Sequence, residues 1–176
     1  MRAQSTQIRH GFDDIAVVNP TFTYLARRPF DPLRFYCLLH SPWPKDVDAS
    51  GCFWIATRPN WMAEILCVGG NVRYRAGCLW WASLPQGDRF QLPMSRTTLE
   101  RDWHPTFGDR CQRISFTGSG VSPGDVERIF AGCLVQGADD NLDWDPQWSS
   151  LPDPFPQWER LHPAWKRHDR SPQRPS

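Results

Sequence analysis

Lysine is nearly absent from this sequence: of 20 basic residues among 176, only Lys45 and Lys166 are lysines, and the others are arginines. A phosphate-binding P-loop closes on Gly-Lys-Ser/Thr, because its lysine must reach the terminal phosphates of the nucleotide. Lys45 lies in the segment Trp-Pro-Lys-Asp and Lys166 in the segment Trp-Lys-Arg, so neither closes such a loop. The sequence therefore excludes a P-loop nucleotidase within this chain.

Long hydrophobic runs are also lacking. No apolar stretch approaches the ~18–20 residues that cross a bilayer, and residues 1–10 contain no apolar signal region. The net charge of +1 gives no overall attraction to nucleic acid or to an acidic membrane surface. We expect a soluble, cytoplasmic protein that does not associate with membranes.

Paired cysteine motifs are missing as well. Six cysteines are present, but none forms a C-x-x-C pair, so a zinc ribbon or a thioredoxin-like redox motif has no support. We expect reduced thiols packed as small hydrophobic side chains. Cys37 and His40 fall on one helical face, and His104 could approach Cys111, but two ligands are fewer than the three or four that zinc needs. We predict no metal site and no cofactor.

Motifs for enzymatic chemistry are not found either. The sequence contains no G-x-S-x-G elbow, no H-E-x-x-H helix and no paired carboxylates in a structured segment. The acidic segment 139–145 lacks the spacing and the glycine of an EF-hand loop. We therefore predict a protein that is not an enzyme.

Tryptophan and proline, in contrast, are abundant, with 10 and 17 residues. Part of this excess lies in a tail: residues 137–158 hold five aspartates and four prolines but no lysine or arginine. Basic residues outnumber acidic ones in the segment 159–176. We divide the chain into an N-terminal segment (1–20), a folded domain (21–136), an acidic and then basic Trp/Pro-rich tail that wraps the domain (137–168) and a disordered end (169–176).

Hydrophobic periodicity and turn residues predict the order of elements within the domain. Strands are expected at 21–27, 51–57, 65–68, 71–75, 78–83 and 112–117, with hairpin turns at 69–71 and 76–77. Helices are expected at 32–40, at 94–103 and from Pro123 onward, where Ser122 can cap the first turn. The fold class is therefore α+β: a mostly antiparallel sheet of five to six strands, with about three helices packed mainly on one face.

Several segments together resemble a known family. These are FTYLARRPFDP at 22–32, GCFWIATR at 51–58, the pair Trp80-Trp81, GDRCQ at 108–112 and ISFTG at 114–118. In this order they are similar to the C-terminal domain of CobW-type GTPases, a family linked to the handling of zinc and cobalt. The similarity extends from about Thr21 to Trp158.

The departures from this family limit what the resemblance implies. In the family, the domain follows a GTPase domain with a P-loop and a Cys-rich metal motif, and neither occurs here. Leu25, Asp31, Ser50 and Cys111 also replace residues that are usual in the family. The resemblance implies a non-catalytic binding or regulatory module in zinc homeostasis, or less readily cobalt homeostasis. It would engage a CobW-type GTPase metallochaperone or a metalloprotein client.

The matched motifs supply the candidate interaction surface. Tryptophan and arginine are enriched at the energetic centres of protein interfaces, but the same residues can instead specify the core. The candidate residues are Arg27, Arg28, Phe30, Trp54, Trp80, Trp81, Asp109 and Arg110.

Two other interpretations stay open. The chain can be a truncated remnant of a CobW-type GTPase with no activity of its own. It can also be a sheet that binds single-stranded nucleic acid through arginines and aromatic rings, although the near-zero net charge and the two lysines disfavour nucleic acid as a partner.

Overall fold

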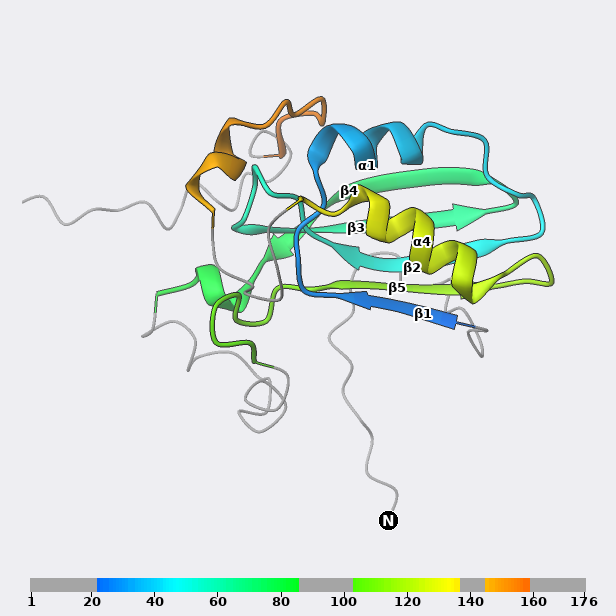
Figure 1. Cartoon of the computed structure of the whole chain (residues 1–176), viewed down its shortest axis with the longest axis horizontal. Helices are drawn as coiled ribbons and strands as arrows, with labels where there is room; N and C mark the ends of the chain where they lie inside the picture. The colour runs from blue at the N-terminus through cyan, green and yellow to red at the C-terminus, as the bar shows by residue number, and fades with distance from the viewer. Residues whose placement is uncertain (1–21, 86–102, 137–144, 159–176) are drawn as a thin grey trace, which may run out of the picture.

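A computed structural model describes residues 22–85, 103–136 and 145–158 of the chain (Figure 1). The strands are β1 (Phe22–Ala26), β2 (Asp48–Phe53), β3 (Trp61–Val68), β4 (Asn71–Leu79) and β5 (Gln112–Thr117). The helices are α1 (Pro32–Leu39) and α4 (Pro123–Cys133), and two short 3-10 turns are η1 (Trp81–Ser83) and η2 (Pro146–Ser150). The fold is α+β, as the sequence predicts.

One five-stranded sheet runs in the order β1-β5-β2-β3-β4, and every paired strand is antiparallel. β5 lies between β1 and β2 although it comes last in the sequence. Phe22 pairs with Phe116 on one side of this strand, and Ala49 pairs with Phe116 on the other. The sheet therefore depends on pairings between residues far apart in the chain.

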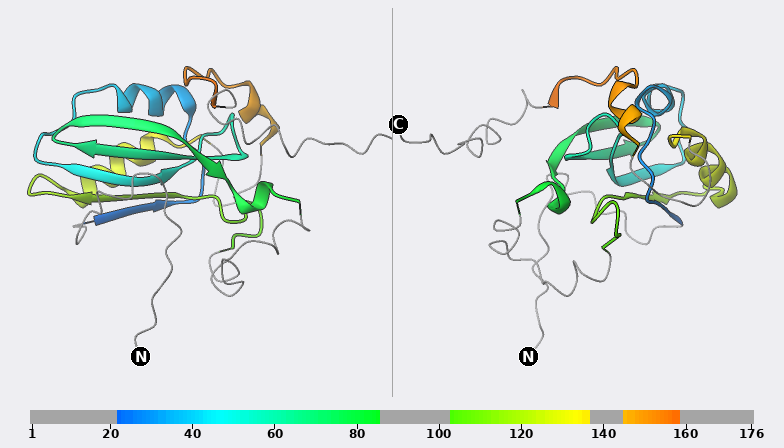
Figure 2. Two further views of the ribbon diagram at one scale, coloured as in Figure 1. Left: turned by 180° about the vertical axis from the view of Figure 1, so that it is seen from behind. Right: turned by 60° about the vertical axis from the view of Figure 1, so that its left-hand side comes forward.

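Helices α1 and α4 both cover the same face of the sheet (Figures 1 and 2). Each begins as the sequence predicts: the Asp31 carboxylate accepts a hydrogen bond from the Arg34 amide at 3.0 Å, and Ser122 caps α4 through the Asp125 amide. A side-chain oxygen at the N-cap satisfies an amide that has no partner within the helix. These caps fix where the two helices start.

The core between helices and sheet is rich in phenylalanine. Phe30 is fully buried and stacks on Phe35 with ring centroids 3.9 Å apart, and Phe130 of α4 meets Phe30 edge-on at 5.9 Å. Replacing one such ring with alanine typically costs about 3–5 kcal/mol of folding free energy. The tail contributes Phe155 and Trp158 to this same core, so residues 145–158 lie against the domain.

The predicted turn at 76–77 is wrong, because β4 continues from Asn71 to Leu79. Gly77 has no positive φ, and the pairing with β3 changes register between Trp61 and Ala63. Gly77 is therefore accommodated within β4 by a β-bulge, and glycine inside a strand often marks such a bulge. The turn at Gly69 and Gly70 is confirmed, with φ of 57° and 79°.

Other boundaries also differ from the predictions. β2 lies at 48–53 instead of 51–57, because the Trp54 amide donates to the side chain of Gln112 and leaves the backbone ladder. The expected strand at 78–83 ends at Leu79 and passes into a 3-10 turn. The described residues contain two α-helices where about three were expected, and the helix predicted at 94–103 lies almost entirely outside them.

Candidate functional site

The motif residues converge at one end of the sheet, where Gln112 joins three segments. Its side chain is fully buried, accepts a hydrogen bond from the Trp54 amide at 3.0 Å and donates to the Arg28 and Trp54 carbonyls, both at 2.9 Å. A buried amide side chain with these partners holds the end of β1 and the end of β2 against β5. Gln112 belongs to the GDRCQ segment, but no sequence signal indicates this role.

Arg110 and Asp109 organise the adjacent loop. Arg110 is mostly buried, and its guanidinium donates to the Pro59 carbonyl at 2.5 Å, the Phe107 carbonyl at 3.1 Å and the Ser83 hydroxyl at 2.8 Å. The Asp109 carboxylate accepts from the amides of Trp81 and Ala82, both at 2.9 Å. Both residues therefore brace the loop that contains η1.

Four members of the predicted interaction surface are buried: Arg110, described above, is 9% exposed, and the other three are aromatic. Phe30 and Trp54 have no exposed surface, and Trp80 is 4% exposed, with its indole N–H donating to the Trp61 carbonyl at 2.9 Å. These rings cannot touch a partner without a rearrangement, so their visible role is to build the core. Trp54 and Trp80 belong to a second buried cluster with Phe107 and Trp148.

The remaining predicted residues reach the surface in part. Arg27, Arg28, Trp81 and Asp109 are half-buried, and Arg27 donates to the Arg110 carbonyl at 3.3 Å. Their contact with a partner stays a prediction.

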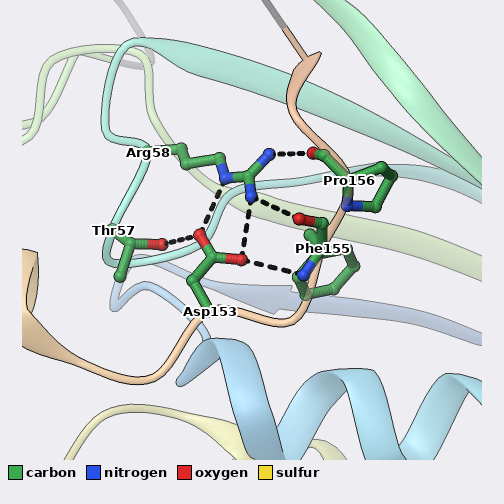
Figure 3. A network of polar contacts seen from close by, with 5 residues as sticks. All are labelled: Thr57, Arg58, Asp153, Phe155 and Pro156. Atoms are coloured by element: carbon green, nitrogen blue, oxygen red, sulfur yellow. Dashed lines mark hydrogen bonds and ion pairs between the residues drawn. The ribbon is translucent and has the colours of Figure 1, made fainter.

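The tail is held to the domain by one arginine (Figure 3). Arg58 makes two bonds to the Asp153 carboxylate, at 2.7 and 2.9 Å, and also donates to the carbonyls of Phe155 and Pro156. Its guanidinium lies 4.5 Å from the centre of the Trp158 ring, within the range of a cation–π contact. Bidentate pairing gives both energy and a fixed geometry, so Arg58 sets the path of the tail.

The sheet face opposite α1 and α4 carries no described helix (Figure 2, left). Strand register places five of its side chains in a row across the whole sheet, which we call row 1: Leu25, Arg113, Cys52, Glu64 and Arg75. The neighbouring row, row 2, consists of Thr23, Ser115, Ser50, Leu66 and Arg73. These two rows define what we call the open face, in which Leu66 of row 2 is buried, at 7% exposed.

The open face combines charge with an apolar edge. Glu64 is 6% exposed and pairs with Arg75 at 2.7 Å, so one carboxylate is neutralised within row 1. Leu25, on the edge strand β1, is 62% exposed. Arg73, Arg75 and Arg113 lie on this face, whereas Arg58 pairs with Asp153 and Arg110 donates to the Pro59 carbonyl.

The cysteines are not all packed as small hydrophobic residues, contrary to the prediction. Cys67 and Cys133 are buried, but Cys37 and Cys78 are exposed. Cys52, on β2, and Cys111, just before β5, are half-buried and close enough for each thiol to shift the pKa of the other. No sequence motif indicates this pair, because it depends on how β2 and β5 align.

The two histidines that were considered as metal ligands have local roles. Nδ1 of His40 lies 2.8 Å from the Tyr36 carbonyl, and Nδ1 of His104 accepts from the amides of Thr106 and Phe107. Across residues 22–85, 103–136 and 145–158, no three or more His, Cys, Asp or Glu side chains are grouped to hold a metal ion. Within the same ranges, no helix is both long and apolar enough to span a membrane.

Comparison with known proteins confirms the family. The family model described as the cobalamin synthesis protein cobW C-terminal domain matches residues 20–134, and the chain belongs to this family. The buried motif residues described above all fall within that range.

Curated relatives share 26% identity with the chain over 146 residues. They include a protein named zinc chaperone Rv0106 from Mycobacterium tuberculosis strain H37Rv and the uncharacterized protein Mb0109 from Mycobacterium bovis. The match covers 82% of this chain but 35% of each relative, so the chain corresponds to about a third of their length. No solved structure matches the chain.

Proposed function

We propose that this protein is a non-catalytic protein-binding module in zinc homeostasis, with a CobW-type GTPase metallochaperone as its partner. The observation that carries the proposal is the open face of a domain of the CobW C-terminal family. The family membership and the relative named as a zinc chaperone support a role related to metal homeostasis. The partner and the mode of binding are our inference.

The size of the relatives supports this choice of partner. In them, the matched region is joined to a further part of the protein about twice as long, because it makes up 35% of their length. A domain that is covalently attached to a larger part in a relative has a surface suited to that part. We infer that the present chain binds a separate protein of the same kind.

The open face has the chemistry of a protein interface. Leu25 offers an exposed apolar side chain at one edge, and Arg73 offers an exposed cation at the other. Rows 1 and 2 contain no aromatic ring on which a base could stack. Since single-stranded nucleic acid is bound largely by such stacking, the open face favours a protein partner.

Affinity capture tests the proposal. The tagged full chain is expected to retain a CobW-type GTPase from native cells grown under zinc limitation, and to retain less of it after zinc repletion. The double variant Leu25→Asp/Arg73→Glu is expected to lose the GTPase. Ile129→Asp is the matched control, because Ile129 is 40% exposed on α4, over the opposite face.

Three results would contradict parts of this account. Capture by the double variant at the wild-type level would remove the open face as the binding surface. Capture of a metalloprotein without the GTPase would favour the client alternative. Capture of neither would favour a truncated remnant without a partner.

A further inference from the structure

Two cysteines from neighbouring strands meet on the open face. Cys52 belongs to β2 and pairs directly with Arg113 of β5, and Cys111 precedes Arg113 by two residues on the same side of the strand. This register makes the two cysteines diagonal neighbours whose thiols shift each other's pKa, and both side chains are half-buried. Two neighbouring thiols within reach of solvent can be oxidised together.

The surroundings of this pair are rich in cationic groups. Arg113 of β5 and Arg27, just after β1, both lower the pKa of the Cys111 thiol through their positive charge. Glu64 of β3 lies opposite Cys52 but is already paired with Arg75 of β4. Positive charge beside a thiol favours the thiolate, which is the nucleophilic form.

The pKa values of the two thiols are shifted in opposite directions. The hydrogen bond from Cys52, together with Arg113 and Arg27, lowers the pKa of the Cys111 thiol to about 6. The pKa of the Cys52 thiol is raised well above its usual value by that same hydrogen bond and by burial. Near neutral pH the pair therefore holds one thiolate, on Cys111, and one thiol, on Cys52.

We propose that Cys52 and Cys111 form a redox-active thiol pair, in which Cys111 reacts with hydrogen peroxide and Cys52 then closes a disulfide between β2 and β5. The inferred reactivity of this pair does not rest on the proposed binding function, although Cys52 is part of row 1 of the open face.

The chemistry is balanced in two steps. The Cys111 thiolate attacks one peroxide oxygen and the O–O bond breaks, which gives a sulfenic acid on Cys111 and releases hydroxide. The Cys52 sulfur then attacks the sulfenic sulfur, the S–O bond breaks, and the departing hydroxide takes the Cys52 proton and leaves as water. The two cysteines are together oxidised by two electrons, and the peroxide is reduced to one hydroxide and one water.

Closing the bond requires Cys111 to move toward Cys52. A disulfide needs closely spaced Cα atoms, and diagonal neighbours in a sheet lie slightly too far apart. Cys111 lies one residue before β5 begins at Gln112, outside the strand ladder, but Arg110 and Gln112 on either side of it are held by hydrogen bonds. The movement therefore has to be confined to Cys111 itself.

The other cysteines supply internal controls. Cys78 is an exposed residue on the same side of the sheet. Partial desolvation of its thiol and the nearby Glu64 carboxylate raise the pKa of that thiol. Cys67 and Cys133 are buried, and Cys37 is exposed on α1. A nonspecific oxidant would select Cys37 and Cys78 first, because they are the most accessible.

The test treats the reduced full chain with stoichiometric hydrogen peroxide at neutral pH and maps the products by nonreducing peptide mass spectrometry. We expect a Cys52–Cys111 disulfide that dithiothreitol reverses. In Cys52→Ser, Cys111 is expected to stop at the sulfenic acid, which dimedone traps. In Cys111→Ser, peroxide consumption is expected to fall by about tenfold or more. Cys78→Ser is the matched control and should form the disulfide at the wild-type rate.

Three results would overturn the proposal. The first is oxidation of Cys37 or Cys78 before the pair, and the second is a Cys52–Cys78 disulfide. The third is dimedone labelling of wild-type Cys111 that never gives way to a disulfide. Because the wild-type map decides each of these, a variant that fails to fold does not leave the question open.

Discussion

Truncating Arg58 is expected to loosen the tail and destabilise the whole domain. In Arg58→Ala, the Asp153 carboxylate, 17% exposed, keeps the Thr57 hydroxyl and the Phe155 amide but loses its counter-charge. Leaving one member of a fully buried pair uncompensated costs about 3–5 kcal/mol. Since this pair retains some contact with water, we expect a loss of about 2–4 kcal/mol of unfolding free energy, including the contact with Trp158.

Urea denaturation measures this change, and Arg128→Ala provides the matched control. Arg128 pairs with Asp125 at the same 2.7 Å distance, but their side chains are 72% and 60% exposed. An exposed pair of this kind contributes little to stability, so we expect a much smaller loss than in Arg58→Ala. Limited proteolysis should also cut residues 145–158 faster in Arg58→Ala. Equal losses of stability in the two variants would refute the reasoning, because burial would then not decide what the ion pair contributes.

Three further predictions concern the sheet. Gln112→Leu removes the acceptor of the buried Trp54 amide and should lower the free energy of unfolding, measured by urea denaturation, by about 2–4 kcal/mol. A loss under about 1 kcal/mol would mean that water replaces the side chain. Gly118→Ala should lower the free energy of unfolding by more than about 2 kcal/mol, because φ is 129° and the new Cβ would lie 1.9 Å from the Asp46 carbonyl oxygen. A wild-type melting curve would contradict this geometry. The rate of Cys111 alkylation by iodoacetamide should rise as pH increases through about 6 and then level off, because the thiolate is the reactive form; a midpoint above pH 8 would show that the neighbouring groups do not stabilise it.

Local sequence signals predicted the elements whose boundaries are chemically marked. Asp31 with Pro32 and Ser122 with Pro123 place the starts of α1 and α4, and the Gly69-Gly70 turn joins β3 to β4. A capping oxygen, a proline in the first turn and a glycine with positive φ act within a few residues. Such features can be read without knowing the rest of the fold.

Features that depend on distant pairings were not predictable in this way. The bulge at Gly77 and the early end of β2 both arise from contacts with other strands or with Gln112. On α4 the neighbouring apolar residues Ile129 and Phe130 differ in the same way, because Ile129 is 40% exposed while Phe130 is buried. A pattern shows which side of a helix is apolar, but not how much of that side the sheet covers.

The candidate site illustrates the same limit. For the motif tryptophans, the sequence could not decide between a core and an exposed interaction surface, and Trp54 and Trp80 prove to be buried. Cys52 and Cys111 are separated by 58 intervening residues and meet only because β5 inserts between β1 and β2. One sequence does not contain the register that aligns them.

The most direct test of the central claim is a binding titration between the purified full chain and a purified CobW-type GTPase metallochaperone. We predict saturable binding that Leu25→Asp/Arg73→Glu weakens by at least about tenfold, which corresponds to about 1.4 kcal/mol, while Ile129→Asp binds like the wild type. Equal affinity of all three proteins, or no binding by any of them, would contradict a partner-binding role for the open face.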